Sequence, residues 1–183
     1  MRKMTKRKVM RSEAGITMIE TLLAASILVI GSLGMIGLIV GSIASNNRNK
    51  IDSTQTMLAE AVLEQINSTF NGTGSSDLVD CAGTSWTIDT TVTSMGSAGA
   101  QLNGTSIDFT QTSPPAGYFM NYVVRTPCTS AGVLQGTYDV RWHLDQIGTS
   151  ETYLLTVGAK LKNHGEGNMF FSLPVNLHMM SGS

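Results

Sequence analysis

The chain has 183 residues and a formal net charge of −1, a length suited to one ordinary domain with an additional element. The charge is unevenly placed. Residues 1–15 hold six of the 12 basic and one of the 13 acidic residues, a net of +5, which leaves six basic and twelve acidic residues, a net of −6, for residues 16–183. Because an apolar stretch follows the basic tail directly, the tail is typical of a membrane flank. The acidic, Gly/Ser/Thr-rich remainder argues against nucleic-acid binding.

The apolar stretch covers residues 16–43 and reads ITMIETLLAASILVIGSLGMIGLIVGSI, with Glu20 as its one charged residue. The uncharged run from Thr21 to Ile43 would form about 35 Å of helix, enough to cross the hydrocarbon layer of about 30 Å. It is longer than the apolar core of about 7–15 residues in a cleaved secretory signal. We therefore expect a single-pass membrane helix, with the tail in the cytoplasm and the remaining residues exported.

A helical pattern continues through residues 44–70. Large apolar residues recur every four positions and would line one face, while two glutamates fall on the other side. The apolar residues are Leu58, Val62, Ile66 and Phe70. The pair Asn71-Gly72 suits a helix stop. The sequence thus predicts one helix from about Thr17 to Phe70, first apolar all round and then amphipathic.

The sequence pattern of the remaining segment, residues 71–183, predicts short strands separated by Gly-, Ser- and Thr-rich turns. The segment 97–104 is expected to be a loop, and Pro174 indicates an edge strand. The predicted fold class is α+β, with a mainly antiparallel sheet that packs against the amphipathic half of the helix. The predicted strands are 85–94, 106–111, 118–126, 137–144, 151–162 and 169–179.

The two cysteines, Cys81 and Cys128, both lie in the part of the chain that is expected to be exported. Because an exported segment meets an oxidising compartment, a disulfide between them is the natural pairing. The alternative is a pair of unpaired, buried thiols.

No catalytic or cofactor-binding motif is apparent, so we expect neither enzymatic activity nor a cofactor. The sequence contains no phosphate-binding Walker loop, no G-x-S-x-G and no H-E-x-x-H. The histidines, His143, His164 and His178, have no metal-ligand spacing with one another or with the cysteines.

The most informative stretch is GITMIETLLAASIL, residues 15–28. With its basic leader, it resembles the processing and assembly signal of type IV pilins and type II secretion pseudopilins. Members of this family have a leader that ends in Gly, followed by a methyl-accepting hydrophobic residue, Thr, a hydrophobic pair and Glu. Here Ile16 stands where Phe is commonest, and Met18 stands where Leu is commonest. The downstream run 27–38 is similar to the Gly-bearing anchor of minor pilins, whereas the head is similar only in its general α+β plan.

This resemblance implies that prepilin peptidase, a membrane-embedded aspartyl enzyme, cuts between Gly15 and Ile16 and N-methylates Ile16. Glu20 would then assist filament assembly by pairing with the N-terminal ammonium of a neighbouring subunit. A carboxylate in the membrane costs about 2.5–3.5 kcal/mol on insertion scales and so demands such a partner. The alternative is that Glu20 only reaches the nearby lipid headgroups.

Four glycines in the apolar stretch also have two interpretations. They could let membrane helices approach closely, or they could let part of the helix lose regular structure within a filament. The four are Gly31, Gly34, Gly37 and Gly41.

We therefore expect a non-catalytic structural subunit, a minor pilin of a type IV pilus. It would be divided into a removed leader (1–15), a filament-core helix (16–43), an amphipathic half-helix (44–70) and an exported head (71–183). Its partners would be other pilin subunits, the inner-membrane assembly platform and the lipid bilayer, and its location the inner membrane and then the cell surface. A pseudopilin of a type II secretion or DNA-uptake system is the alternative within the family. An uncleaved, single-pass membrane-anchored binding protein is the alternative from another class.

Overall fold

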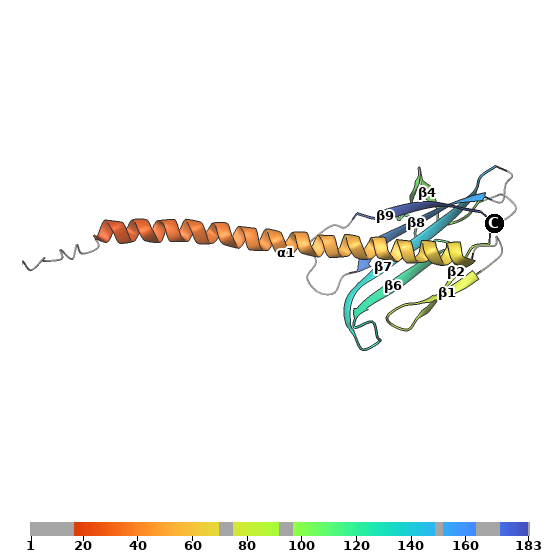
Figure 1. Cartoon of the computed structure of the whole chain (residues 1–183), viewed down its shortest axis with the longest axis horizontal. Coiled ribbons are helices and arrows are strands. Elements are labelled where there is room, and N and C mark those ends of the chain that lie inside the picture. Colours follow the sequence, from red (N-terminus) through yellow and green to blue (C-terminus); the bar gives the residue numbers. More distant parts are fainter. Residues whose placement is uncertain (1–16, 70–74, 92–96, 149–151, 164–172, 183) are drawn as a thin grey trace, which may run out of the picture. The chain divides into compact units, whose positions relative to one another are not determined.

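The computed structural model describes residues 17–69, 75–91, 97–148, 152–163 and 173–182 (Figure 1). The chain divides into two compact units, residues 1–43 and 44–183, and the helix α1 (Met18–Thr69) begins in the first and ends in the second. The strands all belong to the second unit. They are β1 (Ser75–Val79), β2 (Ser85–Asp89), β3 (Ser97–Gly99), β4 (Leu102–Asn103), β5 (Ser106–Ile107), β6 (Phe119–Thr126), β7 (Val133–Gln146), β8 (Thr152–Asn163) and β9 (Val175–Gly182).

The second unit is built on an antiparallel sheet with the order β3-β7-β8-β9, in which β6 also pairs with β7. The long strand β7 pairs along one edge with two strands, with β6 over Val133–Arg141 and with β3 over His143–Asp145. β8 lies on its other edge and is followed by β9. Pro174 directly precedes β9, which ends this strand order, so the missing N–H of Pro174 interrupts no ladder.

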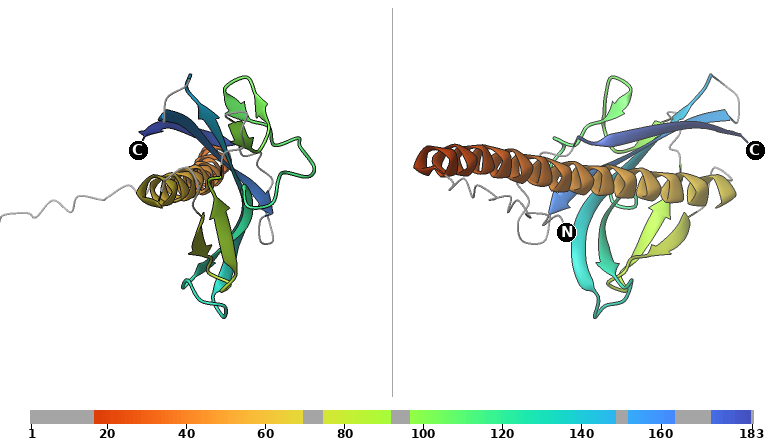
Figure 2. Two further views of the ribbon diagram at one scale, coloured as in Figure 1. Left: turned by 90° about the vertical axis from the view of Figure 1, so that its right-hand side faces the viewer. Right: turned by 60° about the vertical axis from the view of Figure 1, so that its left-hand side comes forward.

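The core lies between one face of this sheet and the second half of α1, which runs across it (Figure 2). Alternate residues of β7 point to the helix, as their spacing predicts, and all of them are buried. These residues are Tyr138, Val140, Trp142 and Leu144. The helix contributes a strip of buried residues that begins closer to the N-terminus than the sequence pattern predicts. Its members are Ile51, Gln55, Leu58, Ala59, Val62 and Ile66.

The opposite face of the sheet is covered by the segment 100–117, which includes the hairpin β4–β5 (Figure 2). Arg141 fastens this segment, because its guanidinium donates hydrogen bonds to the carbonyl oxygens of Asp108 (3.0 Å) and Gln111 (2.9 Å). The same guanidinium forms an ion pair with Asp139 at 2.7 Å. This charged residue is therefore buried with its partners, as a buried charge must be.

The structure corrects several strand boundaries. Residues 97–104, expected to be a loop, contain β3 and β4, and β1 was not predicted at all. The predicted strands 85–94 and 106–111 are shorter in the structure, where β2 ends at Asp89 and β5 ends at Ile107. Phe70, the helix stop at Asn71-Gly72 and residues 169–172 lie outside the described residues.

Candidate membrane and assembly segment

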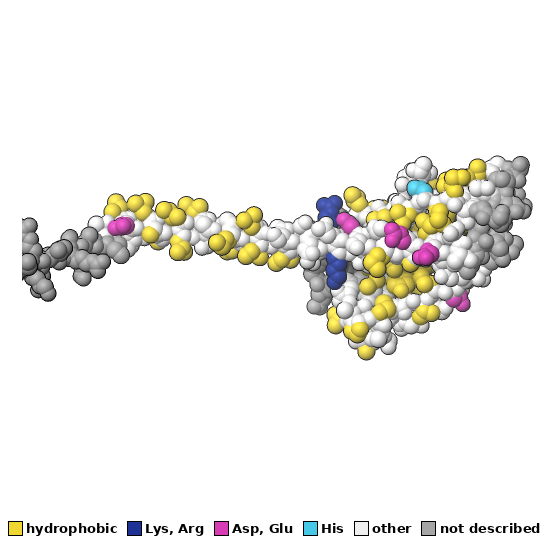
Figure 3. All heavy atoms as spheres, in the orientation of Figure 1, with side chains coloured by type: hydrophobic (Ala, Val, Ile, Leu, Met, Phe, Trp, Pro, Cys, Tyr) yellow, Lys and Arg dark blue, Asp and Glu magenta, His cyan; other side chains and the backbone are white. Residues whose placement is uncertain are grey.

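The first half of α1 presents apolar side chains to its surroundings in every direction. Each described side chain from Thr17 to Ile43 is exposed, including Met18 at 82% and Leu38 at 74%. Figure 3 shows these hydrophobic side chains along the face in view. Among the described residues, α1 is one helix long and apolar enough to span a membrane, which is compatible with single-pass anchoring.

Three hydroxyl groups of this half donate hydrogen bonds to carbonyl oxygens of the helix itself. Thr21 Oγ1 donates to the carbonyl oxygen of Met18 at 2.8 Å, and Ser26 Oγ donates to that of Leu22 at 2.8 Å. Ser32 Oγ follows the same pattern with an oxygen four residues earlier, at 2.7 Å. Because hydrocarbon offers no hydrogen-bond partner, such internal bonds let a helix carry Ser and Thr through lipid.

Thr17 caps the N-terminus of α1. Its side-chain Oγ1 accepts a hydrogen bond from the backbone N–H of Glu20 at 3.4 Å, and its carbonyl oxygen accepts from the N–H of Thr21 at 3.2 Å. Thr followed by Glu three residues later is the pattern of a capping box, a signal that the sequence analysis missed. The negative charge of Glu20 also suits the positive end of the helix dipole.

The Glu20 carboxylate has no ion-pair or hydrogen-bond partner among the described side chains, and it is exposed. It therefore stands as a single acid at the start of an otherwise uncharged run. Gly15 and Ile16, the expected cleavage and methylation positions, lie outside the described residues.

The glycines of the apolar half lie in uninterrupted α-helix. A Cβ added at any of them would meet no heavy atom within 4 Å, the neighbouring backbone of the helix aside. Packing within this chain therefore does not require glycine at these positions. They are Gly31, Gly34, Gly37 and Gly41.

The predicted disulfide is present. Cys81 and Cys128 are joined with an S–S distance of 2.06 Å and a Cα–Cα distance of 4.6 Å. The bond links the turn between β1 and β2 to the segment that follows β6. The backbone N–H of Cys81 also donates to the carbonyl oxygen of Val123 in β6 at 3.2 Å, so the β1–β2 hairpin is held against the edge of the sheet.

Asp80, beside this disulfide, organises the same turn. Its carboxylate is buried and accepts hydrogen bonds from the N–H groups of Ala82 and Thr84, both at 2.9 Å. The indole N–H of Trp86 donates to its second oxygen at 3.2 Å. Since donors surround the carboxylate, its evident role is to fix the hairpin.

The described histidines are engaged in the packing of the sheet. His143 Nδ1 lies 2.7 Å from the carbonyl oxygen of Ala100, and His178 Nδ1 lies 3.0 Å from Thr156 Oγ1. His164 falls outside the described residues. Over the described part of the chain, no group of three or more His, Cys, Asp or Glu side chains could hold a metal ion.

Comparison of the chain with protein-family models, curated proteins and solved structures found no match. The interpretation of this site therefore depends on its own residues.

Proposed function

We propose that this chain is a prepilin that is cut between Gly15 and Ile16, N-methylated on Ile16 and assembled as a minor pilin of a type IV pilus. It acts as a structural subunit, with its apolar half-helix in the membrane before assembly and among other pilin helices afterwards. A pseudopilin would use the same segment in the same way, and the two are separated by the filament with which the protein co-purifies.

The observation that carries this proposal is the position of Glu20. It lies in the first turn of α1, whose side chains from Thr21 to Ile43 are exposed and uncharged, and no described side chain neutralises it. Cleavage after Gly15 would place a new ammonium group four residues before Glu20, about one helical turn away. The same group on a neighbouring subunit, displaced along the helix axis, would give the carboxylate its partner.

The head supports the proposal more generally. The second half of α1 supplies one wall of the core of the head, so the segment that enters the membrane is covalently continuous with the folded head. A disulfide in this unit is consistent with an exported location.

The N-terminus of the mature protein tests the proposal. Mass spectrometry of the protein from purified membranes is expected to show an N-terminal peptide that begins at Ile16 and is heavier by one methyl group. Cells that lack prepilin peptidase serve as the control and should retain the residues before Ile16.

An intact leader in cells with active peptidase would contradict the proposal and favour a membrane-anchored binding protein. Replacement of Gly15 by a bulky residue gives a second control, because it should block the cut while leaving the apolar segment unchanged.

A further inference from the structure

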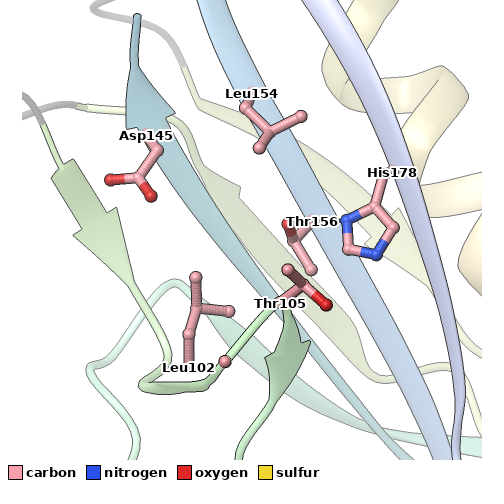
Figure 4. A pocket seen from close by; sticks show the side chains of 7 residues that line it. Leu102, Thr105, Asp145, Leu154, Thr156 and His178 are labelled. Atoms are coloured by element: carbon pink, nitrogen blue, oxygen red, sulfur yellow. Dashed lines mark hydrogen bonds between the residues drawn. The ribbon is translucent and has the colours of Figure 1, made fainter.

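A cavity of about 400 Å³ lies between the β4–β5 hairpin and the face of the sheet that points away from α1 (Figure 4). The hairpin supplies its outer wall, and strands β7, β8 and β9 supply its floor. The side chains that line it include Leu102, Thr105, Asp145, Leu154, Thr156 and His178.

The hairpin is fixed at both ends, so the cavity has stable walls. Before it, the N–H of Ala100 donates to the carbonyl oxygen of Trp142 at 2.9 Å. At its end, the N–H of Ile107 donates to Asn176 Oδ1 at 3.0 Å. The buried Ile107 side chain also packs on Gly158, where an added Cβ would lie 2.9 Å from Ile107 Cγ1. Gly158 therefore seats the hairpin on the sheet.

The cavity has an apolar middle and polar sides. Figure 4 shows Asp145 and His178 on opposite sides, with Leu154 and the threonines between them. The Asp145 side chain is 47% exposed, and its oxygen lies 3.5 Å from His143 Nε2, which leaves the carboxylate with unused acceptor capacity. His178 has its Nδ1 engaged by Thr156.

We propose that this cavity binds an alkylammonium group, with the aliphatic chain between Leu102 and Leu154 and the ammonium at Asp145. An ionised carboxylate beside apolar walls favours a cation with an apolar stem. The net charge of −6 over residues 16–183 favours a cationic ligand over an anionic one. This proposal does not depend on the assignment as a pilin.

The probe is n-butylammonium, which reproduces the end of a lysine side chain. The full chain is placed in phosphatidylcholine nanodiscs, and saturation-transfer NMR measures binding against empty nanodiscs. We expect saturable binding of n-butylammonium and at least about tenfold weaker binding of n-butanol, which lacks the charge.

Two matched variants locate the site. Asp145→Asn should weaken n-butylammonium binding about tenfold or more, because the charge-assisted hydrogen bond is lost. Asp77→Asn removes an exposed carboxylate on β1, outside the residues that line the cavity, and should leave binding unchanged. Circular dichroism checks that both variants remain folded.

A second comparison identifies the source of the ammonium. Binding of the peptide Gly-Lys-Gly, and loss of binding when its lysine is acetylated, would assign the site to a lysine side chain of a partner protein. Binding of n-butylammonium without the peptide would assign it to a free amine. The proposal is overturned if n-butylammonium gives no signal above empty nanodiscs, or binds equally well to Asp145→Asn.

Discussion

The backbone N–H of Glu20 lies 3.4 Å from Thr17 Oγ1, so the proposed assembly residue also belongs to the capped first turn of α1. Because this bond uses the backbone N–H, a substitution of the side chain at position 20 leaves it in place. Such a substitution therefore tests the charge of Glu20, whereas a substitution of Thr17 removes the cap.

Replacement of Glu20 by Ala or Gln is expected to leave cleavage and membrane insertion intact and to impair incorporation into filaments. Gln keeps the length of the side chain and the backbone hydrogen bond to Thr17, but it cannot form an ion pair with an ammonium group. Immunoblotting of sheared filaments against the membrane pool measures incorporation. Thr17→Ala is the control, since it removes the cap and keeps the charge. Normal incorporation of Glu20→Gln would show that Glu20 acts only at the helix start or at the headgroups.

Truncation of Ile66, which is fully buried between α1 and the sheet, is expected to destabilise the head. Ile66→Ala should lower the free energy of unfolding by about 2–5 kcal/mol, the usual range for a large side chain lost from a core. Met57→Ala is the matched control on the same helix, because Met57 is 66% exposed, and its effect should stay within about 0.5 kcal/mol. Urea titration followed by circular dichroism measures both. Equal effects would mean that this half of α1 does not contribute to the core.

A shortened chain that begins at Asn46 is expected to be soluble, folded and monomeric, because it keeps the buried strip of α1 and drops the apolar half. A chain that begins at residue 72 should aggregate, since the core face of the sheet would be open to water. Size exclusion and circular dichroism compare the two. The architecture described here would be refuted by equally good folding of the shorter chain.

Removal of the disulfide with Cys81→Ser and Cys128→Ser together is expected to lower the free energy of unfolding by up to about 4 kcal/mol in the chain-entropy model. The β1–β2 hairpin should then show the largest increase in amide hydrogen exchange, because the disulfide ties it to the segment after β6. Exchange within β7 and β8 serves as the internal reference. A uniform increase across all strands would indicate general destabilisation in place of a local tether.

Burial, reinforced by the nearby Asp89 charge, raises the pKa of Tyr118 from its ordinary value of 10.0 to about 12. The unfolded chain therefore loses this proton first. The contribution of this pKa shift to the free energy of unfolding is fully present below about pH 10 and is lost as the pH rises towards about 12. Tyr118 also donates a hydrogen bond to the carbonyl oxygen of Thr91. Tyr118→Phe should reduce stability at neutral pH by about 0.5–1.5 kcal/mol and flatten its fall between about pH 10 and pH 12. Urea titrations over this range, with tyrosinate absorbance, provide the measurement, and an unchanged slope would contradict it.

The parts of the fold that the sequence predicts well are those with a long, regular pattern. The four-residue spacing of Leu58, Val62 and Ile66 predicts the buried face of α1, and the alternation in β7 predicts its core side. The antiparallel α+β layout follows from the same patterns, whereas the disulfide was predicted from the expected export of both cysteines. The fully buried Gln55 was missed because a polar residue in an apolar stripe gives no such signal.

The covering segment 100–117 could not be predicted, because contacts distant in sequence define it. Arg141 alternates with Val140 and Trp142, a pattern that predicts a solvent-facing side chain, yet it is 6% exposed once Asp108 and its neighbours fold over it. β3 is three residues long and ends at Gly99, whose φ of +121° suits glycine and whose missing Cβ allows close approach to Trp142. This short strand forms because it pairs with β7, not because of its own composition.

The hydrogen bond from Ser181 Oγ to Asn67 Oδ1 joins β9 to the last turns of α1 across 114 positions of sequence. α1 leaves the ribosome early, whereas the strand that it contacts here leaves it near the end. The buried strip of the helix consequently has no completed sheet to pack against until β7, β8 and β9 have all been synthesised. A nascent head would therefore pass through a period with its apolar strip uncovered, in which a chaperone could hold it. Slow delivery of the last strands would lengthen that period, and aggregation would rise with it.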